Sequence, residues 1–217
     1  MSRYELIVFD WDGTLMDSAG LIVHCVQEAA RDIGVTPPTP SQARSIIGLG
    51  LGEALREALP QLPSHRHTEL AARFRHHYLA RDHELQLFPG AAAMVERLAA
   101  RGRRLGVATG KSRQGLQRAM EQSCLRRFFD AVRCADDCPS KPHPQMLLEL
   151  MQEIDVAAER TLMIGDATHD LTMAREAGVA AVAVSYGAHE RQRLQAAQPL
   201  YCAASVVDLA AWLEANA

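Results

Sequence analysis

Residues 6–14 read LIVFDWDGT and carry the strongest structural signal in the chain. A short apolar run followed at once by acidic residues and a glycine is typical of a buried parallel strand that ends in a loop. In open sheets of parallel strands, ligands bind beside the carboxyl ends of the strands. Asp10 and Asp12 are therefore predicted at a binding site, where Gly13 permits the tight turn that lets both carboxylates face one cleft. The simpler alternative is a solvated acidic turn.

Further segments repeat this pattern of a short apolar run that ends in polar residues. The strand candidates are 105–108, 161–164 and 179–184, with 129–132 as a weaker one. Between them, apolar residues at three- and four-residue spacing predict helices at 90–101, 113–122, 143–154 and 167–177, and a final amphipathic helix at 206–213. The alternation of strand and helix predicts an α/β fold, a doubly wound parallel sheet of the Rossmann-like kind.

Residues 17–83 interrupt this alternation. They contain helical patterns, the proline cluster at 37–40 and turn signals, but no convincing strand. The segment follows the first strand directly, so both of its connections lie near the carboxyl end of that strand. We expect an α/β core formed by residues 1–16 and 84–217, and a small all-α cap formed by residues 17–83 that can act as a lid.

Two loops carry groups that suit a phosphate. Thr109 and Gly110 follow the run 105–108 and offer a hydroxyl and backbone amides ahead of a helix, which favours anion binding. Lys141 lies between rigid residues in the sequence SKPHP, where its ammonium can act as a point charge against phosphate oxygens. The alternatives are an ordinary helix-capping residue and a solvated loop lysine.

A second acidic loop follows the run 161–164. Asp166 and Asp170 come directly after this buried strand, and Asp166 is placed to serve as an oxygen ligand of a hard cation. Both could instead be helix N-caps. Each local alternative is reasonable alone, but chance explains poorly the occurrence of two acidic strand ends, an anion-binding turn and a lysine in this order.

The motifs together resemble those of the haloacid dehalogenase-like hydrolase superfamily. DWDGTL, ATG, SKPHP and GDATHD match its four motifs between residues 10 and 170. Within the superfamily the chain is most similar to the phosphoglycolate phosphatase group, whose helical cap is inserted directly after the first motif. The resemblance implies a phosphatase of a small phosphorylated metabolite, enclosed between cap and core.

The resemblance also implies catalytic roles by position. Asp10 is the nucleophile that becomes an aspartyl-phosphate, and Asp12 is the general acid in the first step and the general base in the second. Thr109, the Gly110 amide and Lys141 bind the oxygens of the transferring phosphoryl group.

The same resemblance implies a magnesium site. Mg²⁺ is expected between the Asp10 carboxylate, the Asp12 backbone carbonyl and Asp166, with Asp170 in support. Lys111 lies beside the anion-binding turn and could meet a substrate carboxylate, but its side chain is expected in solvent.

Other members of the superfamily remain as alternatives. A phosphosugar mutase would share every core residue, so the motifs leave it open. A catalytically silent binding protein predicts damage to at least one catalytic position, and none is damaged. A haloacid dehalogenase is disfavoured because such relatives lack the second aspartate of the first motif, here Asp12.

Composition limits the partners and the location. A formal charge of −3 over 217 residues provides no basic field for nucleic acid. No apolar run approaches the roughly 20 residues of a membrane-spanning helix. The five cysteines are an odd number without paired metal-ligand spacing, and no leader precedes Tyr4, which favours a reducing cytoplasm. We expect a cytoplasmic monomer or weak dimer whose partner is a small phosphorylated metabolite, without nucleic acid or membrane.

Three groups of residues have a functional appearance that their context does not support. The glycine loop 48–52 lacks dinucleotide-binding spacing and a preceding strand, so it is predicted to be a cap element that influences substrate choice. Cys134 and Cys138 are interpreted as ordinary thiols. No catalytic role is assigned to His143 or His169.

Overall fold

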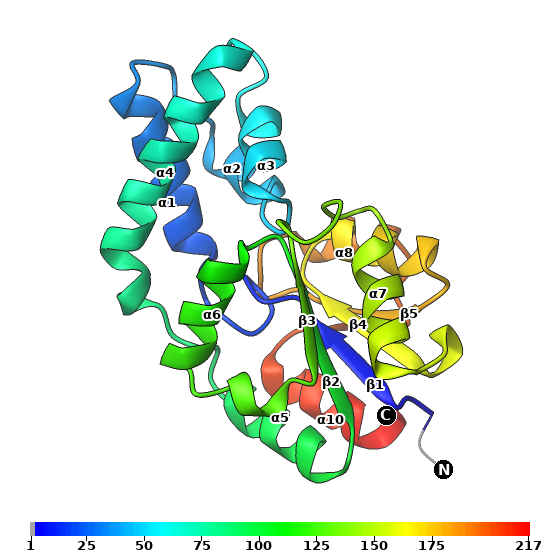
Figure 1. Cartoon of the computed structure of the whole chain (residues 1–217). Coiled ribbons are helices and arrows are strands. Elements are labelled where there is room, and N and C mark those ends of the chain that lie inside the picture. Colours follow the sequence, from blue (N-terminus) through cyan, green and yellow to red (C-terminus); the bar gives the residue numbers. More distant parts are fainter. Residues whose placement is uncertain (1–2) are drawn as a thin grey trace.

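The computed structural model describes residues 3–217, so residues 1 and 2 of the predicted core lie outside the described residues. Its centre is a six-stranded sheet with the order β3-β2-β1-β4-β5-β6, in which every neighbouring pair is parallel (Figure 1). The strands are β1 (Leu6–Phe9), β2 (Arg104–Thr109), β3 (Ala131–Cys134), β4 (Thr161–Gly165), β5 (Ala180–Val184) and β6 (Tyr201–Ala203). The predicted doubly wound parallel sheet is confirmed.

Helices cover both faces of this sheet. They are α5 (Ala91–Ala100), α6 (Arg113–Gln122), α7 (Gln145–Ile154), α8 (Thr168–Glu176), α9 (Arg191–Ala196) and α10 (Val206–Asn216). Successive residues of a strand point to opposite faces. Accordingly, Ile7 and Phe9 pack in one cluster with α5, α6 and α10, and Leu6 and Val8 pack in another with α7 and α8. Burial on both faces explains why β1 is apolar throughout.

The predicted and observed elements differ at the edges of the sheet. The weak strand candidate at 129–132 begins later, at Ala131, because Phe129 packs its ring edge-on against Phe9 instead of joining the strand. Strand β6 and helix α9 were not expected. Both are short, and the strand has the sequence YCA, which lacks the apolar run of the central strands.

We call residues 17–83 the cap segment. It contains α1 (Ala19–Asp32), α2 (Pro40–Ser45), α3 (Leu51–Ala58) and α4 (His67–Arg81), which share their own hydrophobic cluster. In Figure 1 these helices, coloured from blue to blue-green, stand apart from the helices that cover the sheet. Thr39 begins α2 with a capping box, in which its hydroxyl accepts the Gln42 N–H at 3.2 Å.

The division into cap and core at residues 16/17 and 83/84 stays a prediction. No helix within residues 3–217 combines the length and the apolar character needed to cross a membrane.

Candidate active site

The candidate site lies where the order of strands reverses around β1. Because β1 pairs with β2 on one side and β4 on the other, the residues that end these strands are neighbours. Asp10 follows β1, Thr109 ends β2 and Asp166 follows β4. Lys141 reaches the same place from the loop after β3, and all four side chains are buried. The structure thus brings together residues that the sequence places far apart.

Three buried carboxylates surround one ammonium group. Oxygens of Asp10, Asp166 and Asp170 lie within 4.8 Å of one another. Lys141 Nζ lies 2.8 Å from Asp10 Oδ1 and 2.6 Å from Asp170 Oδ1. Burial raises the pKa of Asp10 to about 7 against the opposing effect of Lys141, and burial also raises the pKa of Asp166 well above its ordinary value. When all three carboxyl groups are ionised, their negative charge exceeds the single positive charge of Lys141.

The carboxylate oxygens of this cluster fit a hard divalent cation. The two oxygens of Asp166 accept hydrogen bonds from Thr14 Oγ1 at 3.2 Å and the Ala188 N–H at 2.6 Å. Asp10 Oδ2, in contrast, has no hydrogen-bond partner among residues 3–217. A buried oxygen without a partner is costly, and cations such as Mg²⁺ prefer oxygen ligands. The cluster can hold such an ion through Asp10 and Asp166.

Gly13 allows the first acidic loop to pass over this cluster. Its φ is +79°, and a Cβ there would lie 2.1 Å from Asp166 Oδ2. A larger residue would therefore collide with the carboxylate as well as strain the backbone. Glycine is thus required at position 13 for two reasons, the tight turn and the close approach of the two loops.

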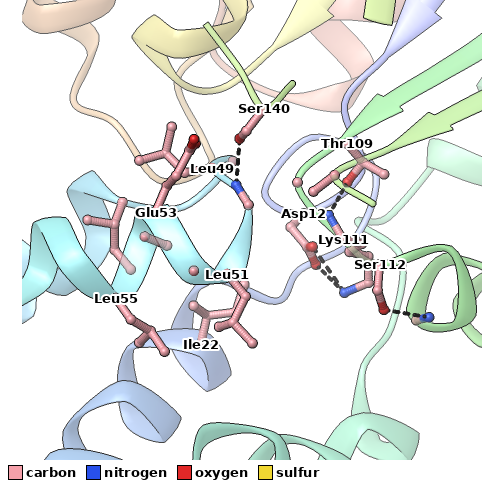
Figure 2. Close-up of a pocket in the computed structure, with 18 of the residues that line it drawn as sticks. Asp12, Ile22, Leu49, Leu51, Glu53, Leu55, Thr109, Lys111, Ser112 and Ser140 are labelled. Carbon is pink, nitrogen blue, oxygen red and sulfur yellow. Dashed lines mark hydrogen bonds and ion pairs between the residues drawn. The ribbon is translucent and has the colours of Figure 1, made fainter. Parts of the chain in front are cut away.

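Asp12 lies on the opposite side of the loop, toward the cap segment. Its Oδ1 accepts the Ser18 hydroxyl at 2.6 Å, and Lys111 Nζ lies 3.0 Å from each carboxylate oxygen. Lys111 Nζ also donates to Tyr78 Oη of α4 at 2.7 Å. Figure 2 shows the two bonds from Lys111 to Asp12. Burial opposes the charge on Lys111, but Asp12 and Tyr78 together raise the pKa of its ammonium.

The expectation that Lys111 points into solvent is wrong. Its side chain is only 10% exposed, because Tyr78 of the cap segment covers it. The contact joins residues 33 positions apart in different parts of the fold. Sequence spacing around Lys111 therefore contains no signal for it.

The cap segment touches the anion-binding turn directly. A Cβ on Gly110 would lie 2.3 Å from the Leu49 carbonyl oxygen and 2.5 Å from that of Gly48. Nearby, the Gly50 N–H donates to Ser140 Oγ at 2.7 Å, beside the buried Lys141. The glycine loop 48–52 thus lies over both loops that were predicted to bind phosphate.

A family model described as haloacid dehalogenase-like hydrolase matches residues 7–184. The chain belongs to this family. A protein of Dickeya dadantii named "Probable phosphatase IndB" is 36% identical over 200 residues, which cover 89% of this chain and 86% of that protein. The phosphoglycolate phosphatase of Vibrio cholerae is 30% identical and covered to 92% in both chains.

A solved structure of this family has the same architecture. The haloacid dehalogenase-like hydrolase of Streptococcus pneumoniae superposes with a TM-score of 0.84 at 28% identity, over 98% of this chain and 99% of that one. The family match and the similarity to phosphatases make the present chain a phosphatase of the haloacid dehalogenase-like superfamily.

Two histidines of this hydrolase join the core to the cap segment. His189 Nδ1 accepts the Thr168 N–H at 3.1 Å, so its Nε2 carries the proton and donates to the Ser45 carbonyl at 3.1 Å. His169 Nε2 donates to the same carbonyl at 3.0 Å. Burial, followed by the charge of Arg193, lowers the pKa of His189 to about 4. Sequence reasoning overlooked His189, which lies 144 positions from Ser45.

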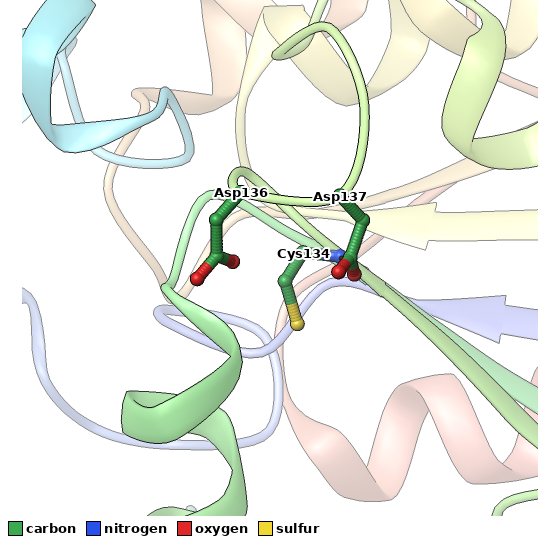
Figure 3. Close-up of side chains that lie close together, drawn as sticks. All are labelled: Cys134, Asp136 and Asp137. Atoms are coloured by element: carbon green, nitrogen blue, oxygen red, sulfur yellow. Dashed lines mark hydrogen bonds between the residues drawn. The ribbon is translucent and has the colours of Figure 1, made fainter.

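A second group of residues of the types that bind metals lies at the end of β3 in this hydrolase. Cys134, Asp136 and Asp137 have ligand atoms within 4.8 Å of one another (Figure 3). Asp136 accepts the Arg113 N–H at 2.8 Å, and Asp137 accepts the Cys134 N–H at 2.7 Å and the Arg113 side chain at 3.0 Å. Burial raises the pKa of Cys134 to about 12, which disfavours the thiolate that binds metals. The two aspartates therefore have a structural role: they hold the loop after β3 against the start of α6 through Arg113.

Proposed function

We propose that this hydrolase is a magnesium-dependent phosphomonoesterase that acts on a small phosphorylated metabolite through an aspartyl-phosphate on Asp10. The observation that carries the proposal is the placement of Asp10. It is fully buried between two other carboxylates and Lys141, and its Oδ2 has no hydrogen-bond partner among the described residues. Such an oxygen is available to a cation or to phosphorus. Phosphoglycolate is the first candidate substrate because of the resemblance to that phosphatase group.

The chemistry proceeds in two displacements. A carboxylate oxygen of Asp10 attacks phosphorus, and the bond from phosphorus to the ester oxygen breaks. Asp12 gives its proton to the departing alcohol oxygen. In the second step Asp12 takes a proton from water, whose oxygen attacks phosphorus and releases Asp10 and inorganic phosphate. Asp12 suits both steps because it lies on the cavity side of the loop that carries Asp10.

Three groups hold the phosphoryl oxygens during these steps. Thr109 contributes its hydroxyl, Gly110 its backbone N–H, and Lys141 its ammonium, which is already fixed beside Asp10 at 2.8 Å. Positioning and electrostatic stabilisation are the main contributions of a protein to phosphoryl transfer. Mg²⁺, held by Asp10, the Asp12 carbonyl and Asp166, would supply positive charge that reduces repulsion between the nucleophile and the phosphate.

The test is phosphate release from a panel of phosphoglycolate, sugar phosphates, nucleotides and pyrophosphate, with Mg²⁺ or a chelator. We expect Mg²⁺-dependent release by the wild type and none by Asp10→Asn. During turnover, borohydride should reduce the acyl phosphate to homoserine, a mass change that peptide mass spectrometry locates at residue 10. Folded protein that releases no phosphate from any compound would refute the phosphatase proposal and favour a mutase or a silent binding protein.

A further inference from the structure

The cavity between the cap segment and the core is large for a two-carbon acid. Its volume is about 610 Å³, and it extends from Asp12, Thr109 and Gly110 to helices α1, α3 and α4. Cavities of roughly 300–1,000 Å³ enclose ligands of drug size. The non-reacting part of phosphoglycolate is one methylene and one carboxylate, which would leave most of this space to water.

The cap side of the cavity has a group of apolar side chains, next to the charged residues Glu53, Arg56 and Arg75. Side chains of three helices line it, namely Ile22, Val26, Leu51, Leu55, Phe74 and Leu79. Ile22, Leu51 and Phe74 are only partly buried, although they pack against the hydrophobic cluster of the cap segment. Figure 2 shows Ile22 and Leu51 across the cavity from Asp12 and Lys111. These side chains keep an apolar surface that no described residue covers.

An aromatic wall continues this surface toward the reacting end. The rings of Phe74 and Tyr78 are stacked, with centroids 5.7 Å apart and planes at 22°, and both residues line the cavity. Lys111, beside Tyr78, already donates to Asp12 and to Tyr78 Oη. Of the arginines that line the cavity, Arg56 and Arg75 are exposed to solvent, and Arg118 is paired with Asp82 at 3.5 Å. A substrate carboxylate would have to displace Asp12 from Lys111. The groups next to the phosphate position thus favour a ring or an aliphatic body over a second anion.

We propose that this hydrolase selects phosphate monoesters whose alcohol part is a bulky, mainly apolar body of about the size of one ring. The body lies against α1, α3 and α4 while the phosphate lies at Asp10. Its burial removes apolar surface of both partners from water, a gain that a small polar acid does not provide. The inference rests on the proposed phosphatase function and names its substrate class.

The test compares two esters of primary alcohols, ethyl phosphate and 2-phenylethyl phosphate, which differ in the body but have similar leaving groups. We expect kcat/KM to be at least about tenfold higher for 2-phenylethyl phosphate than for ethyl phosphate. The kcat/KM of phosphoglycolate is measured alongside them. Leu51→Asn should lower the ratio of the two values. The control Leu148→Asn makes the same chemical change at a leucine of α7 that is 43% exposed and lies outside the cavity, and it should leave the ratio unchanged.

Two further measurements separate the possible failures. Acetyl phosphate, which has an activated leaving group and a small body, reports whether phosphoryl chemistry occurs at all. If it is inert along with both esters, the phosphatase proposal fails and this inference fails with it. If acetyl phosphate is hydrolysed but the kcat/KM of ethyl phosphate or of phosphoglycolate equals that of the phenylethyl ester, only the proposed substrate class is wrong. Calorimetric binding to Asp10→Asn with Mg²⁺ should show tighter binding of the phenylethyl ester, and equal binding would also overturn the inference.

Discussion

Replacing Asp10 with asparagine should stabilise the metal-free protein at neutral and alkaline pH, although it removes the proposed nucleophile. Asp10, Asp166 and Asp170 are buried together with a single ammonium, that of Lys141. Asparagine keeps the shape of the side chain but removes one negative charge. Lys141 retains its contact with Asp170 in the variant, so the buried ammonium is not left without a partner.

The magnitude follows from the pKa of Asp10, which burial raises from 3.8 to about 7. Because the folded protein binds this proton more tightly than the unfolded chain, native stability is lost as the pH rises from 3.8 to about 7. At about 1.4 kcal/mol per pH unit, the loss reaches about 4 kcal/mol. For a chain of this size, that corresponds to roughly 8–16 °C in Tm. Asp10→Asn should recover up to this amount.

Thermal and urea unfolding in a chelator, at about pH 4 and about pH 8, measure the effect. The gain of Asp10→Asn over the wild type should be near zero at the lower pH and several degrees at the higher one. Adding Mg²⁺ should raise the Tm of the wild type more than that of the variant. Asp17→Asn, a change of an exposed aspartate, is the control and should alter neither value. A variant less stable than the wild type at about pH 8 in chelator would refute the reasoning.

Three other substitutions test contacts of the site. Lys141→Met leaves buried carboxylates without their cation, so it should abolish phosphate release and cost about 3–5 kcal/mol in urea unfolding at about pH 8; unchanged stability would contradict the burial argument. Tyr78→Phe removes the hydroxyl that anchors Lys111, a bond of about 1 kcal/mol, and should lower kcat/KM by about fivefold and the Tm by only about 2–4 °C. The pKa of His189 is held at about 4, below 6.5 for the unfolded chain, so native stability should fall by up to about 3 kcal/mol as the pH drops from 6.5 to 4. His189→Gln should flatten this dependence in urea titrations, and an equal slope in both proteins would exclude His189 as its source.

The central sheet was predictable because each of its central strands has its own local sequence signal. Each core strand is a short apolar run, and parallel strands deliver their last residues to one edge of the sheet. That rule alone places Asp10, Thr109 and Asp166 near one another, as observed. Strand β6 was not predicted, because an edge strand of three residues needs little apolar sequence.

Contacts between the cap segment and the core were not predictable in this way. Tyr78 covers Lys111, and Ser45 accepts from His189, only because two separately packed units meet at these points. The hydrophobic periodicity of a sequence predicts helices and strands, but it does not indicate how one packed unit is placed on another. For the same reason the sequence left open the size of the cavity and the character of its wall.

Several contacts of the cap segment with the core are made by its own backbone. Ser45 offers a carbonyl to two histidines, Gly50 offers an N–H to Ser140, and the Leu49 carbonyl faces Gly110. Main-chain atoms are common to all amino acids, so these particular contacts do not depend on which side chains the cap segment has at those positions. Residues that face the cavity, such as Leu51, can therefore be exchanged during evolution while these backbone contacts between cap and core are kept. New substrates can then be recruited one substitution at a time, while the phosphoryl-transfer groups stay as they are.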